Sequence, residues 1–212
     1  MIDRIDITDS ILILGDLIKN SPHSHLAQHK KNQRIDVKRN EKIYYIESGK
    51  VSFYRMSDDL LTISMSAPCI VGIAQMLFQY QTHYIRCDSN CTIWIIDSID
   101  AKSIFSKENL WVHAFNILAK LTQQYFEREY MILQKNSREI VLQHLMFIWQ
   151  MTEEERLHTS IYNFILSRNH LSRSSVHKIV SEMEAEGKIK TSKGKLVYLS
   201  LESTSYGSRD SQ

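Results

Sequence analysis

LSRSSVHKIV, residues 171–180, belongs to the most informative pattern in this chain. Ser172 can cap the N-terminus of a helix, because its hydroxyl accepts a hydrogen bond from a free backbone N–H of the first turn. Val176, Ile179 and Val180 then share one face of that helix. The opposite face carries small or basic side chains: Arg173, Ser174, His177, Lys178 and Ser181. A helix with one packed face and one donor-rich face is typical of a reader of the DNA major groove.

The segments on either side complete a larger motif. Ile161, Phe164 and Ile165 recur at helical spacing before the turn, and Gly187 ends the reading helix. Residues 188–199, KIKTSKGKLVYL, alternate across a Gly-containing turn, which predicts a basic β-hairpin. Helix, turn, helix and hairpin together predict a winged helix-turn-helix.

Charge is concentrated in this motif. The whole chain has 26 Lys+Arg against 24 Asp+Glu, a formal net charge of +2 that does not by itself indicate nucleic acid. Residues 168–198 hold seven Lys and Arg against three Glu, a local charge of +4, and the three Glu stand late in the helix. The local charge therefore favours DNA as the partner. A small helical module that binds protein or senses a small molecule, without binding DNA, is the alternative.

Nine residues are candidates for DNA contact. Arg173 and Lys178 suit a guanine edge or a phosphate, whereas Ser172 and Ser175 suit backbone phosphate. The candidates on the helix are Ser172, Arg173, Ser174, Ser175, His177 and Lys178. The candidates on the wing, which would neutralise phosphates, are Lys190, Lys193 and Lys195.

The N-terminal half has the pattern of antiparallel β-structure. Short runs rich in β-branched and aromatic residues alternate with polar or Gly-containing turns, which predicts a roll or a sandwich over residues 1–100. Glu47-Ser48-Gly49-Lys50 is interpreted as a hairpin turn. The predicted strands are Ile43 to Glu47, Val51 to Arg55, Leu60 to Met65, Tyr84 to Cys87 and Thr92 to Asp97.

Helical periodicity begins near Ser98 and predicts one long helix over residues 101–135. Its stripe repeats at strict sevens, with Leu110, Ile117 and Met131 beside it, so the helix could pair two chains. The residues at sevens are Trp111, Leu118, Tyr125 and Ile132. The alternative is that this face covers the β-domain. Asn136-Ser137 offers a break and an N-cap, and residues 136–212 form the predicted DNA-binding domain with a short disordered tail.

Composition excludes several classes of protein. With 212 residues and 43% hydrophobic residues the chain can bury a core, and its apolar runs are too short to span a membrane. Asp3, Asp6 and Asp9 stand where a secretory signal carries basic residues, and the three Cys give no disulfide framework, so we expect a protein of the reduced cytoplasm. No phosphate loop, nucleophile elbow or HExxH motif occurs, so we do not expect an enzyme.

On these residues the chain resembles the family of bacterial regulators related to the cyclic-AMP receptor protein and the fumarate-nitrate reductase regulator (CRP/FNR). Residues 171–176 look like that family's Ser-Arg-x-Thr-Val recognition helix, residues 43–51 like its β-roll hairpin, and residues 68–72 like the loop that opens its effector pocket. The resemblance covers nearly the whole chain. It implies an α+β fold: a cyclic-nucleotide-binding-like β-roll, a long dimerisation helix and a winged helix-turn-helix. It also implies an inverted-repeat DNA site and RNA polymerase as a further partner.

Departures from the family pattern argue against its usual effectors. Nucleotide-binding members follow the loop Gly with a Glu and place an Arg about ten residues on; here Ile73 follows Gly72, and His83 stands at the Arg position. Arg86 could substitute only if the loop were three residues longer. We therefore expect no cyclic nucleotide.

We expect no bound cofactor or metal. No Cys precedes Cys69, which excludes the family's N-terminal iron–sulfur cluster. His23, His25, His29 and His83 are haem ligands in residue type only, and the spacing of the first three matches no familiar closed metal site.

Two further hypotheses concern stress. Cys87 and Cys91 could lie close together as a thiol switch, with two ordinary buried cysteines as the alternative. The LSRSSV form and the altered pocket are similar to a divergent enterobacterial subgroup, that of the inhibitor of hydrogen peroxide resistance. That subgroup would imply a role in stress-response regulation.

Overall fold

The structure is a computed structural model that describes residues 7–35, 42–76 and 81–200. The chain divides into two compact units, Met1–Arg128 and Glu129–Gln212. In the described part of the chain, no helix combines the length and the apolar character needed to cross a membrane.

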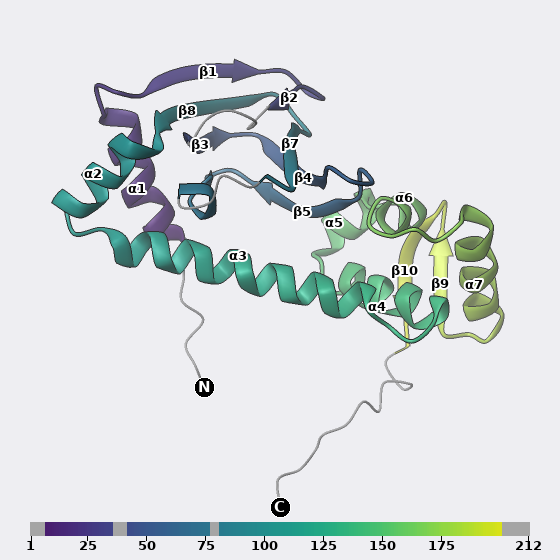
Figure 1. The fold of residues 1–212 in the computed structure, drawn as a ribbon. Helices are drawn as coiled ribbons and strands as arrows, with labels where there is room; N and C mark the ends of the chain where they lie inside the picture. Colours follow the sequence, from purple (N-terminus) through teal and green to yellow (C-terminus); the bar gives the residue numbers. More distant parts are fainter. Residues whose placement is uncertain (1–6, 36–41, 77–80, 201–212) are drawn as a thin grey trace, which may run out of the picture. The chain divides into compact units, whose positions relative to one another are not determined.

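The N-terminal unit contains two antiparallel four-stranded sheets (Figure 1). One has the strand order β1-β8-β3-β6 and the other the order β2-β7-β4-β5. The strands are β1 (His25–His29), β2 (Arg34–Ile35), β3 (Lys42–Ser48), β4 (Lys50–Arg55), β5 (Leu61–Ser66), β6 (Cys69–Val71), β7 (His83–Cys87) and β8 (Cys91–Asp97). Apolar side chains from both sheets, among them Ile46, Val51 and Ile93, form the core between them. The predicted β-structure is confirmed.

The predicted hairpin at Gly49 is wrong. β3 pairs with β6 and β8, whereas β4 pairs with β5 and β7, so the chain passes from one sheet to the other at Gly49. Gly49 has a φ of 101°, and an added Cβ would lie 2.4 Å from the Asn90 carbonyl oxygen. A residue with a side chain would therefore be strained and would clash. The sequence predicts a turn at Gly49, but the pairing of the flanking strands shows that the chain crosses there from one sheet to the other.

A helix that the sequence analysis did not predict begins the N-terminal unit. α1 (Thr8–Asn20) buries Ile11, Leu14 and Ile18, which recur at spacings of three and four. With α2 (Ser98–Lys107) and α3 (Trp111–Ile132), α1 covers the outer face of the sheet β1-β8-β3-β6. Figure 1 shows α1 and α2 together at one end of the sheets.

The single helix predicted over 101–135 is two helices, α2 and α3. Asn109 separates them with a φ of 55°, a left-handed conformation that Asn tolerates better than most residues. The backbone N–H of Leu110 donates to the Phe105 carbonyl and that of Asn109 to the Ser106 carbonyl. This pair of bonds is a Schellman motif, which satisfies the last carbonyls of α2 and ends it.

The C-terminal unit is a small helical core closed by a hairpin. Its elements are α4 (Ser137–Trp149), α5 (Glu153–His158), α6 (Ile161–Leu166), α7 (Arg173–Ala185), β9 (Ile189–Ser192) and β10 (Lys195–Leu199). Asn136 caps α4 as predicted, by accepting from the Glu139 N–H at 2.9 Å. Buried Leu145, Ile165 and Val180, from three different helices, hold the core together. Thr152 and Glu155 start α5 through a capping box.

Candidate DNA interface

α7 starts at the residue that the sequence predicts. The Ser172 hydroxyl accepts a hydrogen bond from the Ser175 N–H at 3.1 Å, which confirms Ser172 as the N-cap. The Ser172 hydroxyl also lies 2.9 Å from that of Ser174 and 2.8 Å from that of Ser175. Three hydroxyls therefore gather at a helix N-terminus, where unpaired backbone N–H groups favour an anion such as phosphate.

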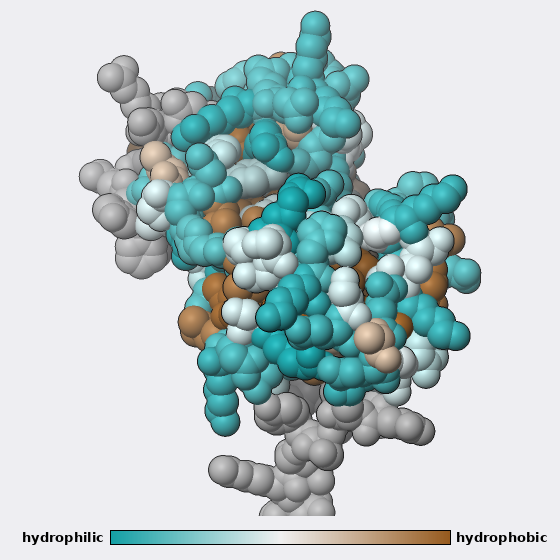
Figure 2. Space-filling model, turned by 90° about the vertical axis from the view of Figure 1, so that its right-hand side faces the viewer, coloured by the Kyte–Doolittle hydropathy of each residue, from teal (hydrophilic) through white to brown (hydrophobic). Residues whose placement is uncertain are grey.

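The two faces of α7 differ as the sequence requires. Val176, Val180 and Met183 are buried against the core of the unit. Arg173, Ser174, His177 and Lys178 are exposed on the other side. The side of the molecule on which α7 lies is drawn face-on in Figure 2, and its surface is mainly hydrophilic. Among the described residues, no ion pair occupies Arg173 or Lys178, so both cations are available to a ligand.

The acidic residues of α7 are held by internal partners. Arg138 of α4 contacts the Glu182 carboxylate at 3.5 Å and the Glu186 carboxylate at 2.6 Å. Lys188 reaches Glu186 at 2.7 Å, and hydrogen bonds from Lys188 and the Arg138 charge hold the pKa of Glu186 below its usual range. Glu184 accepts from both the backbone N–H and the hydroxyl of Thr191. The carboxylates thus lie at the end of α7 opposite to Ser172 and do not offset the charge of its first turns.

Tyr162 is a residue of the interface that the sequence analysis missed. Its ring stacks on the His177 imidazole with centroids 3.9 Å apart and an interplanar angle of 16°. It also lies against Gly194 in the wing turn, and the neighbouring Ile161 N–H donates to the Gly194 carbonyl at 3.0 Å. Tyr162 therefore fixes the orientation of His177 and ties the wing turn to α6. The periodicity of α6 gave no indication of this, because Tyr162 lies beside the apolar stripe.

The wing is a tight hairpin that presents its lysines unequally. Lys193 and Gly194 both have positive φ, 49° and 74°, as a two-residue turn of type I′ requires. Lys193 is exposed at the tip, and the Lys190 ammonium lies 5.9 Å from the centre of the Tyr198 ring. Lys195 instead donates to the His158 carbonyl at 2.9 Å, at the C-terminus of α5. Of the three predicted wing contacts, Lys195 is the one whose ammonium hydrogen-bonds to another described residue.

A buried His–Asn pair sets the turn between α6 and α7. His144 is fully buried, and its Nδ1 donates to the Ile140 carbonyl at 2.7 Å. Its Nε2 faces the Asn169 amide nitrogen at 3.5 Å. Asn169 donates to the Ile165 carbonyl and accepts from the Leu171 N–H at 2.9 Å. The side chain of Asn169 thereby makes the bonds that orient the chain as it enters α7.

The comparisons with known proteins agree with this architecture. Residues 137–201 match a family model described as winged helix-turn-helix DNA binding. The c-di-GMP-responsive global regulator CLP of Xanthomonas campestris superposes with a TM-score of 0.68 at 14% identity, over 91% of this chain and 99% of that one. A CRP/FNR-family regulator from Eubacterium rectale superposes with a TM-score of 0.63 at 17% identity, over 89% and 90%. The fold is that of the CRP/FNR regulators.

Two curated relatives add a more specific similarity. The inhibitor of hydrogen peroxide resistance of Escherichia coli K12 is 29% identical over 159 residues, which cover 74% of this chain and 76% of that protein. The protein of the same name from Salmonella typhimurium is 27% identical over the same length. The resemblance to that subgroup is thus confirmed. Two of the solved structures that share the fold are described as a global regulator and a transcriptional regulator.

The CRP/FNR-type fold shows where the predicted departures lie. Ile73 is 4% exposed and packs into the core beneath α1. The Arg86 guanidinium lies 4.2 Å from the centre of the Tyr54 ring and is directed away from the core between the sheets. The Ile73 side chain carries no hydrogen-bonding atom.

The histidines and cysteines form no recognisable cofactor site. No group of three or more His, Cys, Asp or Glu among the described residues could hold a metal ion. Cys69, Cys87 and Cys91 are free thiols buried between the sheets. Burial raises the pKa of the Cys69 thiol to about 12 and that of the Cys87 thiol to about 12. Because the thiolate is the reactive form, this environment favours ordinary buried cysteines over a thiol switch.

Proposed function

We propose that the protein is a homodimeric transcription regulator that binds an inverted repeat in double-stranded DNA. The observation that carries this proposal is the N-terminal half of α7. Arg173 and Lys178 are exposed there and form no ion pair with another described residue, and the hydroxyls of Ser172, Ser174 and Ser175 lie together at the N-terminus. Arg173 and Lys178 would contact guanine or phosphate, with Ser174 and His177 as further base contacts. Ser172, Ser175, Lys190 and Lys193 would contact phosphates, with Lys195 in a smaller role because of its internal bond.

Pairing of two chains would run along a face of α3 other than the stripe predicted from sequence. Ile117 is buried, and Leu118 packs against the core of the β-domain, so these two residues face the sheet. The exposed face instead carries apolar residues at heptad spacing: Val112, Phe115, Ala119 and Phe126. Phe115 is 67% exposed and Phe126 68% exposed, more than a large apolar side chain favours. A second α3 packed on this face would bury them.

The pairing is tested by measuring mass in solution. Wild-type protein should sediment as a dimer, and Phe126→Glu should shift it to monomer at the same concentration. Leu157→Glu is the matched control, since Leu157 is also an exposed apolar residue and lies in the other unit. Monomeric wild type, or an equal effect of both variants, would contradict pairing through this face.

A selection from random DNA tests DNA binding and identifies the operator in the same experiment. The full chain selects duplexes from a random pool, and the selected sequences should contain half-sites about 10–10.5 base pairs apart, because each recognition helix reads one major groove. Affinity should fall steeply with salt, with a slope of about −0.9 for each phosphate neutralised. Failure to enrich any sequence, together with binding that salt does not weaken, would favour the alternative of a module that does not bind DNA.

We further place this regulator in the cytoplasm and in the response to oxidative stress. The support for the stress role is the name of the curated relatives, which refers to hydrogen peroxide resistance. Comparing transcripts of a deletion strain and its parent, with and without peroxide, tests the role directly. An unchanged response to peroxide would remove it.

A further inference from the structure

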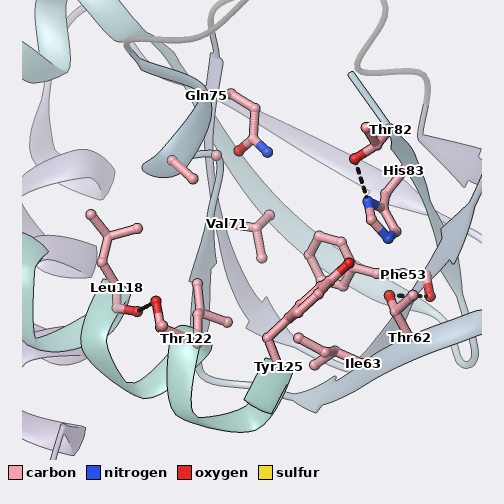
Figure 3. Close-up of a pocket in the computed structure, with 13 residues that line it drawn as sticks. Phe53, Thr62, Ile63, Val71, Gln75, Thr82, His83, Leu118, Thr122 and Tyr125 are labelled. Atoms are coloured by element: carbon pink, nitrogen blue, oxygen red, sulfur yellow. Dashed lines mark hydrogen bonds between the residues drawn. The ribbon is translucent and has the colours of Figure 1, made fainter. Parts of the chain in front are cut away.

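A pocket of about 350 Å³ lies in the N-terminal unit, remote in sequence from the residues of the DNA interface. Its walls come from β4, β5, the segment from β6 through η1 (Ala74–Met76), the start of β7, and α3. This volume is within the range of about 300–1,000 Å³ that small-molecule sites occupy. Figure 3 shows Tyr125 rising from α3 toward Phe53, and Gln75 directed toward Val71 from the opposite wall.

The described lining of this pocket is mainly apolar. No Asp, Glu, Lys or Arg is among the described residues that line it. The apolar part of the lining consists of Phe53, Ile63, Val71, Leu118, Leu121 and the ring of Tyr125. A phosphate or carboxylate placed here would lose its water without gaining an opposite charge from the lining, which is costly.

His83 supplies a buried hydrogen-bonding atom to this pocket. The threonine hydroxyls of the lining are engaged: Thr62 donates to the Phe53 carbonyl at 3.1 Å, and Thr122 to the Leu118 carbonyl at 2.9 Å. Thr82 is bonded to His83 Nδ1 at 2.7 Å. His83 Nε2 is buried and has no partner among the described residues. Figure 3 places this nitrogen on the side of the ring that faces Tyr125 and Phe53.

The protonation state of His83 also suits an uncharged ligand. Burial lowers the pKa of the imidazole, and the nearby Arg128 and Arg55 guanidinium groups lower it further, while Asp58 opposes them. The ring is therefore neutral at pH 7 and offers one donor or one acceptor at Nε2, according to its tautomer.

We propose that this pocket binds an uncharged, mainly apolar molecule of ring size that carries one hydrogen-bonding group, which pairs with His83 Nε2. The lining excludes cyclic nucleotides by its lack of a cation for the phosphate. Leu118, Leu121, Thr122 and Tyr125 bring α3 into contact with the occupant. The occupant would act as the effector of the regulator, because it would contact the helix that is proposed to pair the two chains. This role rests on the proposed function.

The test uses the free full-length protein and a neutral fluorescent probe, N-phenyl-1-naphthylamine. The probe should bind saturably at one site per chain. It should be displaced by 2-naphthol, whose hydroxyl can pair with His83, more effectively than by naphthalene, which has no such group. Cyclic AMP at millimolar concentration should not displace it.

Two variants locate the site. His83→Phe keeps a ring but removes Nε2, and should weaken displacement by 2-naphthol about fivefold to tenfold while leaving naphthalene unchanged. Ala74→Trp fills part of the pocket from an exposed lining position and should reduce binding of all three aromatics. His25→Phe is the matched control, since His25 is exposed on β1 and is not among the lining residues. Far-UV circular dichroism confirms that each variant is folded.

The outcomes separate this inference from the proposed function. Three results would overturn the proposed ligand class. They are the absence of saturable binding, competition by cyclic AMP at the concentration that suffices for 2-naphthol, and loss of the probe signal in Phe126→Gln instead of Ala74→Trp. Phe126 lies on the exposed face of α3, where a dye could bind nonspecifically. A protein that binds the probe but selects no DNA would overturn the proposed function alone.

Discussion

The N-terminal half of α7 and the pocket beside α3 differ in charge: α7 carries exposed cations, whereas the described lining of the pocket is uncharged. On α7, Arg173 and Lys178 are exposed and form no ion pair with another described residue. The carboxylates at the C-terminal end of the helix instead contact Arg138, Lys188 and Thr191. In the pocket, no lining residue of the described chain carries a charged side chain, and burial keeps His83 neutral. A surface that meets a polyanion can leave its cations solvated until binding, whereas a pocket that removes part of its ligand from water must match the ligand with its own side chains.

Adding the same carboxylate to both regions should have opposite consequences, and this is the largest expected effect. Val71→Asp places a charge at a position that is 1% exposed, so the free energy of unfolding should fall by about 3–5 kcal/mol. Ser174→Asp adds a carboxylate at an exposed helix N-terminus and should change stability by no more than about 1 kcal/mol, while it weakens DNA binding. Urea denaturation and a DNA titration measure the two effects. Equal stability of both variants would refute the contrast.

Removing a positive charge from the exposed face of α7 should have a smaller effect, which is confined to DNA binding. Arg173→Ala should lose about 1–3 kcal/mol of DNA binding energy and relax the sequence preference at one base pair, because Arg173 is predicted to contact a base edge. Lys188→Ala is the control: Lys188 pairs with Glu186 at the far end of α7 and should leave the preference unchanged. Anisotropy titrations with single-base variants of the selected site give both numbers. An Arg173→Ala protein with unchanged affinity and preference would remove this residue from the interface.

The smallest expected effect is a pH dependence of the pocket. The pKa of His83 is lowered in the folded protein, so the unfolded chain binds more protons as pH falls below the ordinary value of about 6.5. Stability should therefore be complete above that value and decrease as pH falls toward the lowered pKa. His83→Phe should flatten this slope in urea denaturation between pH 5 and 7. His29, whose pKa burial also lowers, should leave a residual slope in that variant.

The sequence pattern alone predicts the parts of the site that are formed by residues close together in the chain. The Ser172 cap, the two faces of α7, the wing turn and the Asn136 cap depend on residues within a few positions of one another. Tyr162 and the His144–Asn169 pair could not be predicted in this way, since each acts across a distance in sequence that periodicity does not encode. The same reason explains Gly49, whose φ suits a hairpin or a corner equally until the strand partners are known.

By itself the sequence determined the winged helix-turn-helix, the β-structure before it and the concentration of positive charge in residues 168–198. Three features became apparent only in the folded chain: the face of α3 that packs on the sheet, the hydrogen bond of Lys195 to the His158 carbonyl, and the set of side chains that line the pocket. Hydrogen-bond caps and helical periodicity act over a few residues, and their signals survive in the order of the amino acids. Burial and pairing depend on what the rest of the chain places opposite each side chain, so they are settled only when the chain has folded.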